Sequence, residues 1–257
     1  MRHKAILLAS AAVAALIIAE PAEAGGLYFS ASGGANFMED QNGSFTTDFF
    51  RGNNTYAAHF DPETGFLLET AVGLELDHWL HGLRTELAMS YRRNSIDGHW
   101  SVSTSISDLA AMDLFTGNIN GHTSTFALMA NAWYEFAIGS RFKPYLGGGV
   151  GWARSSFSGA FQEPNIQVSA AAVDPFDGFN VTNSGFAYQL GAGVTTQVMP
   201  GVSLGIGYRY FDAPSTEIFF SGKLIGDVAP TAVNDANSIK FDNISHSVAL
   251  TLRIDIN

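Results

Sequence analysis

The segment from Gly185 to Phe211, GFAYQLGAGVTTQVMPGVSLGIGYRYF, alternates between two kinds of side chain along almost its whole length. Even-numbered positions up to Val198 are mostly apolar, and the odd-numbered positions between them are small or polar. Met199-Pro200-Gly201 interrupts the pattern with a tight turn, because proline fixes φ and glycine tolerates positive φ. A period of two residues predicts two strands here, each with one apolar and one polar face.

Both strands are long enough to cross a lipid bilayer, which takes about 9–11 residues in a tilted strand. Strands of a water-soluble sandwich also alternate, but they are usually shorter and carry more charge on the polar face. In this segment the second face consists of small and uncharged residues, with Arg209 as its one charge. The pattern therefore favours a membrane-spanning β-barrel.

The N-terminus has the pattern of a secretory signal peptide. Arg2, His3 and Lys4 precede an apolar run over residues 5–19, and Ala22-Glu23-Ala24 follows as a cleavage site. The run is short for a spanning helix, and the cleavage site argues against a retained anchor. We expect residues 1–24 to be removed during export through the inner membrane, and residues 25–257 to form one barrel domain.

The net charge of −11 is concentrated in four long connections, residues 39–64, 95–121, 156–183 and 213–243. These connections hold fifteen acidic and three basic residues, whereas the rest of the chain after residue 24 holds seven and eight. Nucleic-acid binding requires a basic face, so no nucleic-acid partner is expected. The chain has no cysteine, which excludes disulfides and thiolate metal ligands, and no segment has calcium-loop spacing.

The alternation predicts an all-β fold, an eight-stranded antiparallel up-and-down transmembrane barrel. The expected strands are Leu27–Met38, Gly65–Asp77, Leu83–Arg92, Thr123–Phe136, Phe142–Arg154, Gly185–Val198, Val202–Phe211 and Ile244–Ile256. Long and short connections alternate between them, which places both termini and the short turns on the periplasmic side and four long loops outside the cell.

Two connections leave alternatives open. Asp108–Phe115 could form a short helix or pack over the mouth of the barrel. Ile218–Ile225 could form an extra hairpin, so ten strands remain an alternative to eight.

Several segments resemble the bacterial outer-membrane β-barrel family that includes opacity-type and surface-antigen, porin-like proteins. They are GLRTELAMSYRRN at Gly82–Asn94, FALMANAWYEF at Phe126–Phe136, KPYLGGGVGWA at Lys143–Ala153 and FAYQLGAGV…GYRYF at Phe186–Phe211. The resemblance implies an eight-stranded outer-membrane barrel with variable surface loops, whose members serve as adhesins, surface antigens, stabilising proteins or small porins. It implies a fold and a location, not an activity.

The resemblance also implies insertion by the barrel-assembly machinery. Family members usually end in an aromatic residue that this machinery reads. This chain ends in Ile256-Asn257 instead, so either the signal is degenerate or internal strands replace it.

Parity along the strands directs one set of ionisable side chains into the lumen: Glu69, Glu75, Arg84, Glu86, Arg92, Glu135, Lys143, Arg209 and Arg253. Side chains largely fill the lumen of an eight-stranded barrel. Because buried charges are costly unless they are paired, we expect an ion-pair network that holds the barrel rigid. The alternative is a gated path for ions through the same network.

Arg93 and Arg154 break the pattern because they fall on the outward face, at the extracellular ends of their strands. There they are expected either to bind lipopolysaccharide phosphates or simply to reach the interface. His122 and Ser124 share the outward face and form a possible base and nucleophile of a lipid-A-modifying enzyme, but no carboxylate is placed to orient the histidine. The other histidines show no metal-ligand spacing.

The sequence therefore favours a non-enzymatic outer-membrane surface protein, with no cofactor, metal or catalytic residue. Its partners would be outer-membrane lipids, lipopolysaccharide, the assembly machinery and a host or surface ligand that binds the acidic loops. Aromatic residues in those loops could anchor such a ligand or pack against one another: Phe49, Phe50, Tyr56, Trp100, Phe157, Phe161, Phe176, Phe179, Phe219 and Phe220. The alternatives are a small porin or gated channel and, third, a lipid-A-modifying enzyme.

Overall fold

The computed structural model describes residues 26–49, 52–105, 112–139, 141–161, 179–219 and 238–256. The expected signal peptide lies outside these residues. The described strands are β1 Leu27–Met38, β2 Gln41–Phe49, β3 Gly52–Pro62, β4 Gly65–Glu75, β5 Leu83–Ser105, β6 Met112–Glu135, β7 Phe142–Phe161, β8 Phe179–Met199, β9 Val202–Phe219 and β10 Ser238–Ile256. Within the described ranges, no helix is long and apolar enough to span a bilayer.

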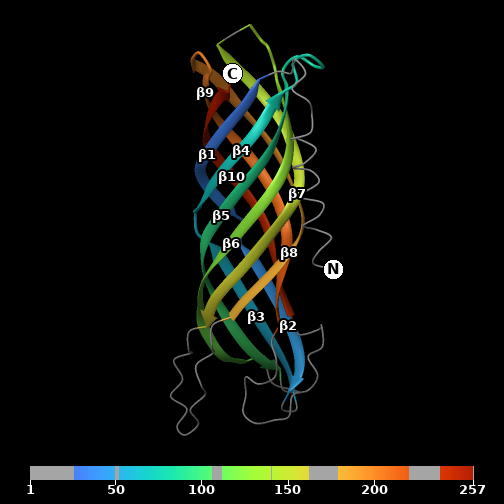
Figure 1. Cartoon of the computed structure of the whole chain (residues 1–257). Coiled ribbons are helices and arrows are strands. Elements are labelled where there is room, and N and C mark those ends of the chain that lie inside the picture. The colour runs from blue at the N-terminus through green and yellow to red at the C-terminus, as the bar shows by residue number, and fades with distance from the viewer. Residues whose placement is uncertain are drawn as a thin grey trace.

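Eight of these strands close into a ring, which Figure 1 shows as a tall tube of tilted strands. Around the ring the order is β1, β10, β9, β8, β7, β6, β5 and β4, and β4 pairs again with β1. All of these pairings are antiparallel. The predicted eight-stranded up-and-down barrel is confirmed, and closure leaves no unpaired edge in the lipid.

The short turns and the ends of the described chain lie together at one end of the tube. Leu27 at the start of β1 pairs with Ile256 at the end of β10. Each of the three short turns contains a glycine with positive φ, Gly82, Gly139 and Gly201, a conformation that disfavours other residues. The turn predicted at residues 199–201 is confirmed, and this end of the barrel is the periplasmic one in the predicted arrangement.

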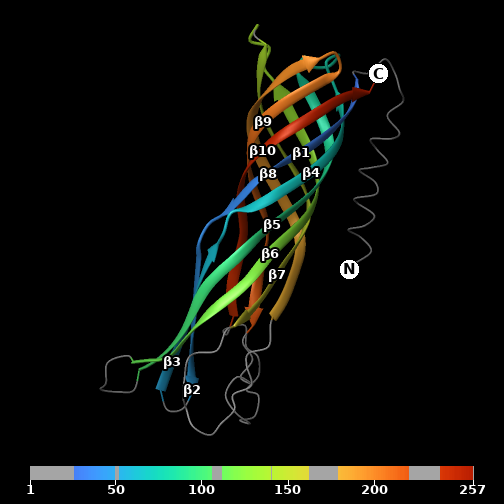
Figure 2. The same cartoon turned by 90° about the vertical axis from the view of Figure 1, so that its left-hand side faces the viewer.

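Residues 39–64, which the sequence predicts as a long polar connection, contain a β-hairpin rather than an irregular loop. Its two strands, β2 and β3, continue the tube at the end opposite to the C-terminus (Figures 1 and 2). Strand β5 pairs with β4 along its first half and with β3 along its second half. The ring therefore extends outward as a second, extracellular tube, which we call the stalk: β2, β3 and the outer halves of β5 to β10.

The stalk closes between β2 and β10. There the side chain of Gln41 makes the two hydrogen bonds that the backbone of a paired strand would otherwise make. Its side-chain Nε2 donates to the carbonyl oxygen of Asp242 at 2.5 Å, and its Oε1 accepts from the Asp242 amide at 2.6 Å. Asp242 sits in an irregularity of β10, between Phe241 and Asn243. One side chain thus satisfies both backbone groups that a neighbouring strand would otherwise pair with.

The polarity of the two faces inverts between the membrane barrel and the stalk. Within the barrel, outward side chains such as Met89 and Leu250 are apolar and exposed, as a lipid-facing surface requires. Farther along β5, the inward Ile96 is fully buried and the outward Asp97 and His99 are exposed. The strand keeps its register while its apolar side changes from the outside to the inside, because the stalk is surrounded by water.

The outer parts of the second and fourth connections also differ from the sequence-based expectation. Strand β6 begins at Met112, so the described half of Asp108–Phe115, for which a short helix was one of two alternatives, is strand. Residues 108–111 lie outside the described part of the chain. Of the extra hairpin predicted at Ile218–Ile225, only Ile218 and Phe219 are described, and they belong to β9, which pairs with β10.

Candidate functional site in the barrel interior

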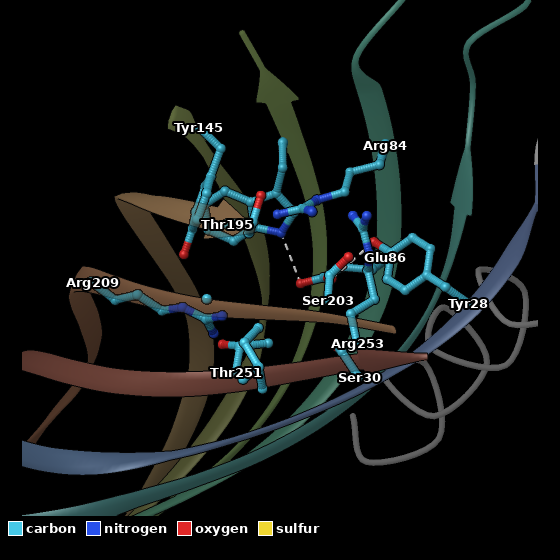
Figure 3. Close-up of a pocket in the computed structure, with 13 residues that line it drawn as sticks. Tyr28, Ser30, Arg84, Glu86, Tyr145, Thr195, Ser203, Arg209, Thr251 and Arg253 are labelled. Atoms are coloured by element: carbon cyan, nitrogen blue, oxygen red, sulfur yellow. Dashed lines mark hydrogen bonds between the residues drawn. The ribbon is translucent and has the colours of Figure 1, made fainter. Parts of the chain in front are cut away.

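The periplasmic third of the lumen contains a cluster of ion pairs around Arg253 of β10. Its guanidinium lies 3.1 Å from Glu135, 3.4 Å from Glu75 and 3.5 Å from Asp255. Arg84 of β5 forms a second ion pair with Glu135. Two arginines thus contact three carboxylates, and Figure 3 shows the side chains of Arg84 and Arg253 entering the same part of the lumen. The cluster joins β4, β5, β6 and β10 across the lumen.

Glu86 lies next to this cluster but accepts hydrogen bonds from uncharged donors. The donors are the Tyr28 hydroxyl at 3.1 Å, the Asn131 amide at 3.0 Å and the Trp133 indole at 2.8 Å. Three donors can stabilise a buried carboxylate without an adjacent cation. Trp133 and Tyr145 meet edge to face at 5.7 Å, and glycines at 147 and 191 leave room for the indole.

The middle of the lumen holds two further arginines in different environments. Arg209 forms an ion pair with Glu69 and lies over the Trp133 ring. Arg92 donates to Ser90 at 2.7 Å, and its guanidinium carbon lies 3.8 Å from the centre of the Phe211 ring. Among the described residues, Nε and Nη2 of Arg92 have no hydrogen-bond partner, although the side chain is buried. Arg92 is therefore held by a cation–π contact and one hydroxyl rather than by a carboxylate.

The ninth predicted lumen residue, Lys143, occupies a different position. It is exposed at the periplasmic mouth, where it lines a cavity of about 110 Å³ together with Glu75, His81 and Glu135. The structure records no ion pair for Lys143 with any described residue. The expected network therefore consists of two separate groups of ion pairs, around Arg253 and Arg209, with Glu86, Arg92 and Lys143 outside them.

Above the charged layers, an apolar cluster crosses the inside of the stalk. It comprises Ala58, Phe60, Ile96, Ile119, Phe157, Ile239 and Phe241, all buried. Phe157 is its centre, with ring centres 5.5 Å from Phe60, 4.7 Å from Phe241 and 5.0 Å from Phe179. Phe157, Phe179 and Trp100 were predicted as exposed anchors or loop contacts, and all three pack at this cluster. We call the seven buried residues of this cluster, named above from Ala58 to Phe241, the apolar plug.

Two cavities deeper in the lumen than the one at the mouth are small. A cavity lined by Arg84, Glu86 and Arg209 measures about 20 Å³, and one lined by Arg92 and Thr123 measures about 10 Å³. A single water molecule needs about 10–15 Å³ of such volume. These two cavities thus have room for isolated waters but not for a hydrated ion.

On the outer surface, Arg93 and Arg154 lie on either side of β6. Register places Arg93 opposite Ser124 and Arg154 opposite Phe126, and both arginines are exposed. Partial burial and the neighbouring Arg93 charge lower the pKa of His122, which lies just beyond the membrane span. The structure records no hydrogen bond between His122 and Ser124 within the described part of the chain. The site thus combines two cations at the outer interface without an assembled catalytic pair.

A model of the outer membrane protein beta-barrel domain matches residues 5–251. The chain belongs to this family. The family assignment and the closed barrel place the protein in the outer membrane of a Gram-negative bacterium, with its outward apolar residues in the lipid.

Similarity to individual known proteins is moderate. An outer membrane protein of Gluconacetobacter diazotrophicus is 28% identical over 276 residues, which cover 100% of this chain and 65% of that protein. A Rickettsia conorii protein whose name proposes an adhesin role is 25% identical over 167 residues, covering 64% and 60% of the two chains. The solved structure of Neisserial surface protein A covers 91% of this chain and 99% of its own, at 17% identity and a TM-score of 0.44.

Parity along the strands predicts an inward set of charged side chains in this family member, but not their partners. Asp255 contacts Arg253 and was omitted from the predicted set, although it has the inward parity. Tyr28, Asn131 and Trp133 were omitted because uncharged donors do not stand out in a search for ion pairs. The apolar plug was missed because inward phenylalanines occur in segments whose outward residues are polar.

Proposed function

We propose that the protein is a non-enzymatic surface protein whose sealed barrel supports an extracellular stalk. The observation that carries this proposal is the apolar plug, which fills the stalk at the level where a channel would open to the outside. Water and ions enter a narrow apolar constriction only at high cost. The acidic segments that the sequence predicts as long connections would serve adhesion or envelope integrity, and the name of the Rickettsia relative supports the adhesin role.

The geometry gives less support to an enzyme. Ser124 and His122 lie on the outward face of β6, and a nucleophile needs a base within hydrogen-bond reach and a group that orients this base. Within the described ranges, no carboxylate hydrogen bond to His122 is recorded. A lipid-A-modifying activity would therefore need groups other than this pair.

Planar-bilayer recording tests the sealed barrel. The folded protein, identified by its heat-modifiable gel mobility, should give no discrete current steps at voltages at which a general porin in the same bilayer conducts. The physical reason is that the apolar plug and the ion-pair clusters lie in series along one lumen.

Reproducible steps would contradict this proposal and favour the small porin or gated channel. In that case Glu69→Gln and Arg84→Met should change the size or the ion selectivity of the steps, because both residues would line the conducting path. Arg141→Gln, in an exposed periplasmic turn, is the control, and it should change neither the size nor the ion selectivity of the steps.

We further propose that Arg93 and Arg154 bind phosphate groups of lipopolysaccharide, as the sequence suggested. Both side chains are exposed on the outer face, and they flank the same strand at neighbouring outward positions. Planar guanidinium groups bind phosphate oxygens through two parallel hydrogen bonds. Insertion by the barrel-assembly machinery is likewise proposed, on the basis of the family alone.

The double variant Arg93→Gln/Arg154→Gln should retain at least tenfold less lipopolysaccharide through purification, since a charge-assisted hydrogen bond contributes about 1.5–3 kcal/mol. The amount can be measured from the phosphate of the co-purified lipid. Arg141→Gln removes one exposed cation at the periplasmic end and should leave retention unchanged. If the wild type and the double variant retain equal amounts of lipopolysaccharide, the proposed phosphate binding is contradicted. Both arginines would then only extend their charged ends to the membrane–water interface.

A further inference from the structure

Two histidines that are far apart in the sequence lie opposite each other on the outer face of the stalk. His59 of β3 pairs directly with His99 of β5. His99 is exposed and His59 is half-buried, on the face opposite to the apolar plug. Their position beyond Arg93 on β5 puts them outside the lipid-facing surface, in contact with the external medium.

The separation of the two rings matches that of two ligands of one metal ion. The two ring centres lie 4.9 Å apart, with the ring planes inclined by 42°. Two imidazoles that bind one tetrahedral ion at metal–nitrogen distances of about 2.0–2.1 Å place their ring centres roughly 5 Å apart. The two rings therefore already lie at the required separation.

A hydrogen bond also sets the tautomer of one ring. Nδ1 of His59 lies 2.7 Å from Oδ1 of Asn42, which pairs with His59 from the other side, on β2. An amide oxygen only accepts hydrogen bonds, so Nδ1 carries the proton and Nε2 keeps its lone pair. Metal-binding histidines are commonly oriented in this way, by a hydrogen bond from the second ring nitrogen.

The surroundings of the pair are polar and negatively charged. The next outward pair along the same two strands is Asp61 opposite Asp97, and both residues are exposed. Their charges favour a cation at the surface of the stalk. Within the described part of the chain, however, no group of three or more His, Cys, Asp or Glu side chains is arranged to hold an ion.

We propose that His59 and His99 together bind one divalent transition-metal ion, with water molecules completing its coordination. Imidazole nitrogens favour zinc, copper and nickel over calcium and magnesium, which prefer oxygen ligands. The ion would link the neighbouring strands β3 and β5 on the outer face of the stalk. With two protein ligands, the site binds more weakly than a closed four-ligand structural site.

Isothermal titration with Zn²⁺ and with Cu²⁺, each added alone to the folded chain in chelator-free detergent, tests the site. The wild type should bind one equivalent of metal ion. His59→Gln and His99→Gln should each lower the affinity for this ion at least tenfold. Asn42→Ala should weaken binding less, because it only frees the orientation of the His59 ring. The bound ion should also raise the unfolding temperature of the stalk in the wild type but not in His59→Gln or His99→Gln, since it binds only the folded state.

Two control variants separate this site from other histidines. His78→Gln/His81→Gln removes both histidines of the β4–β5 turn, and His122→Gln removes the histidine beside Arg93. Both variants should keep the equivalent that His59 and His99 bind. The proposal is overturned if the wild type binds no ion, or if the His59 and His99 variants bind it as tightly as the wild type. In either case the two rings would be a cross-strand aromatic pair only.

Discussion

Replacing Arg253 by methionine should lower the free energy of unfolding by about 3–5 kcal/mol, the cost of breaking a buried ion pair from one side. Arg253 forms ion pairs with three carboxylates, of which Arg84 also contacts only Glu135. The variant therefore leaves Glu75 and Asp255 without a neutralising partner in the lumen. The change can be measured by urea titration of the protein in lipid vesicles, with tryptophan fluorescence as the signal.

Lys143→Met is the matched control, because it removes a cation from the same mouth of the barrel without breaking a recorded ion pair. It should lower the free energy of unfolding by less than about 1 kcal/mol, because exposed charges contribute little to stability. Adding Glu75→Gln to Arg253→Met should recover part of the lost stability. Equal effects of Arg253→Met and Lys143→Met would show that the ion pairs do not hold the barrel together.

Phe157→Ala should destabilise the stalk by about 3–5 kcal/mol while leaving the membrane barrel folded. Phe157 is fully buried and contacts three other aromatic rings of the stalk, so its removal leaves a cavity that none of them can fill without moving. Because the plug lies outside the membrane segment, the loss should remain local. Hydrogen exchange should accelerate in β3 and in the outer halves of β7 and β10, and not in the membrane halves.

Phe126→Ala is the control for this second experiment. Phe126 faces outward on β6, so its removal creates no internal cavity. It should not accelerate exchange in the stalk. Faster exchange throughout the barrel in Phe157→Ala would contradict the separation of the stalk from the membrane part, and unchanged exchange would show that the plug contributes little.

The membrane barrel could be predicted from the sequence because lipid and lumen impose opposite polarities on alternate residues. That rule identified strands such as residues 185–198 and directed Glu69 and Arg209 inward, where they form an ion pair. The rule does not say which inward charges meet, because this depends on strand register and tilt. Arg92 and Lys143 therefore have the predicted parity without the expected partners.

The stalk could not be predicted in the same way. Beyond Asn94 the outward side of β5 becomes polar and its inward side becomes apolar, so the lipid-facing alternation stops without any break in the strand. A search for lipid-facing alternation ends each strand at that point and assigns the remainder to a loop. For the same reason His59 and His99 could not be paired, since their contact depends on the register of two segments that were expected to be irregular.

The hairpin of β2 and β3 lies in sequence between two strands of the ring, β1 and β4. This position suggests how the extracellular surface of the protein can diversify. Between Met38 and Gly65 the chain leaves the ring and returns to it, while β1 and β4 pair directly with each other below. The hairpin is thus an appendage to a membrane ring that is already closed without it. Insertions, deletions and sequence changes in this segment can accumulate under selection at the cell surface without altering strand number or lipid contacts.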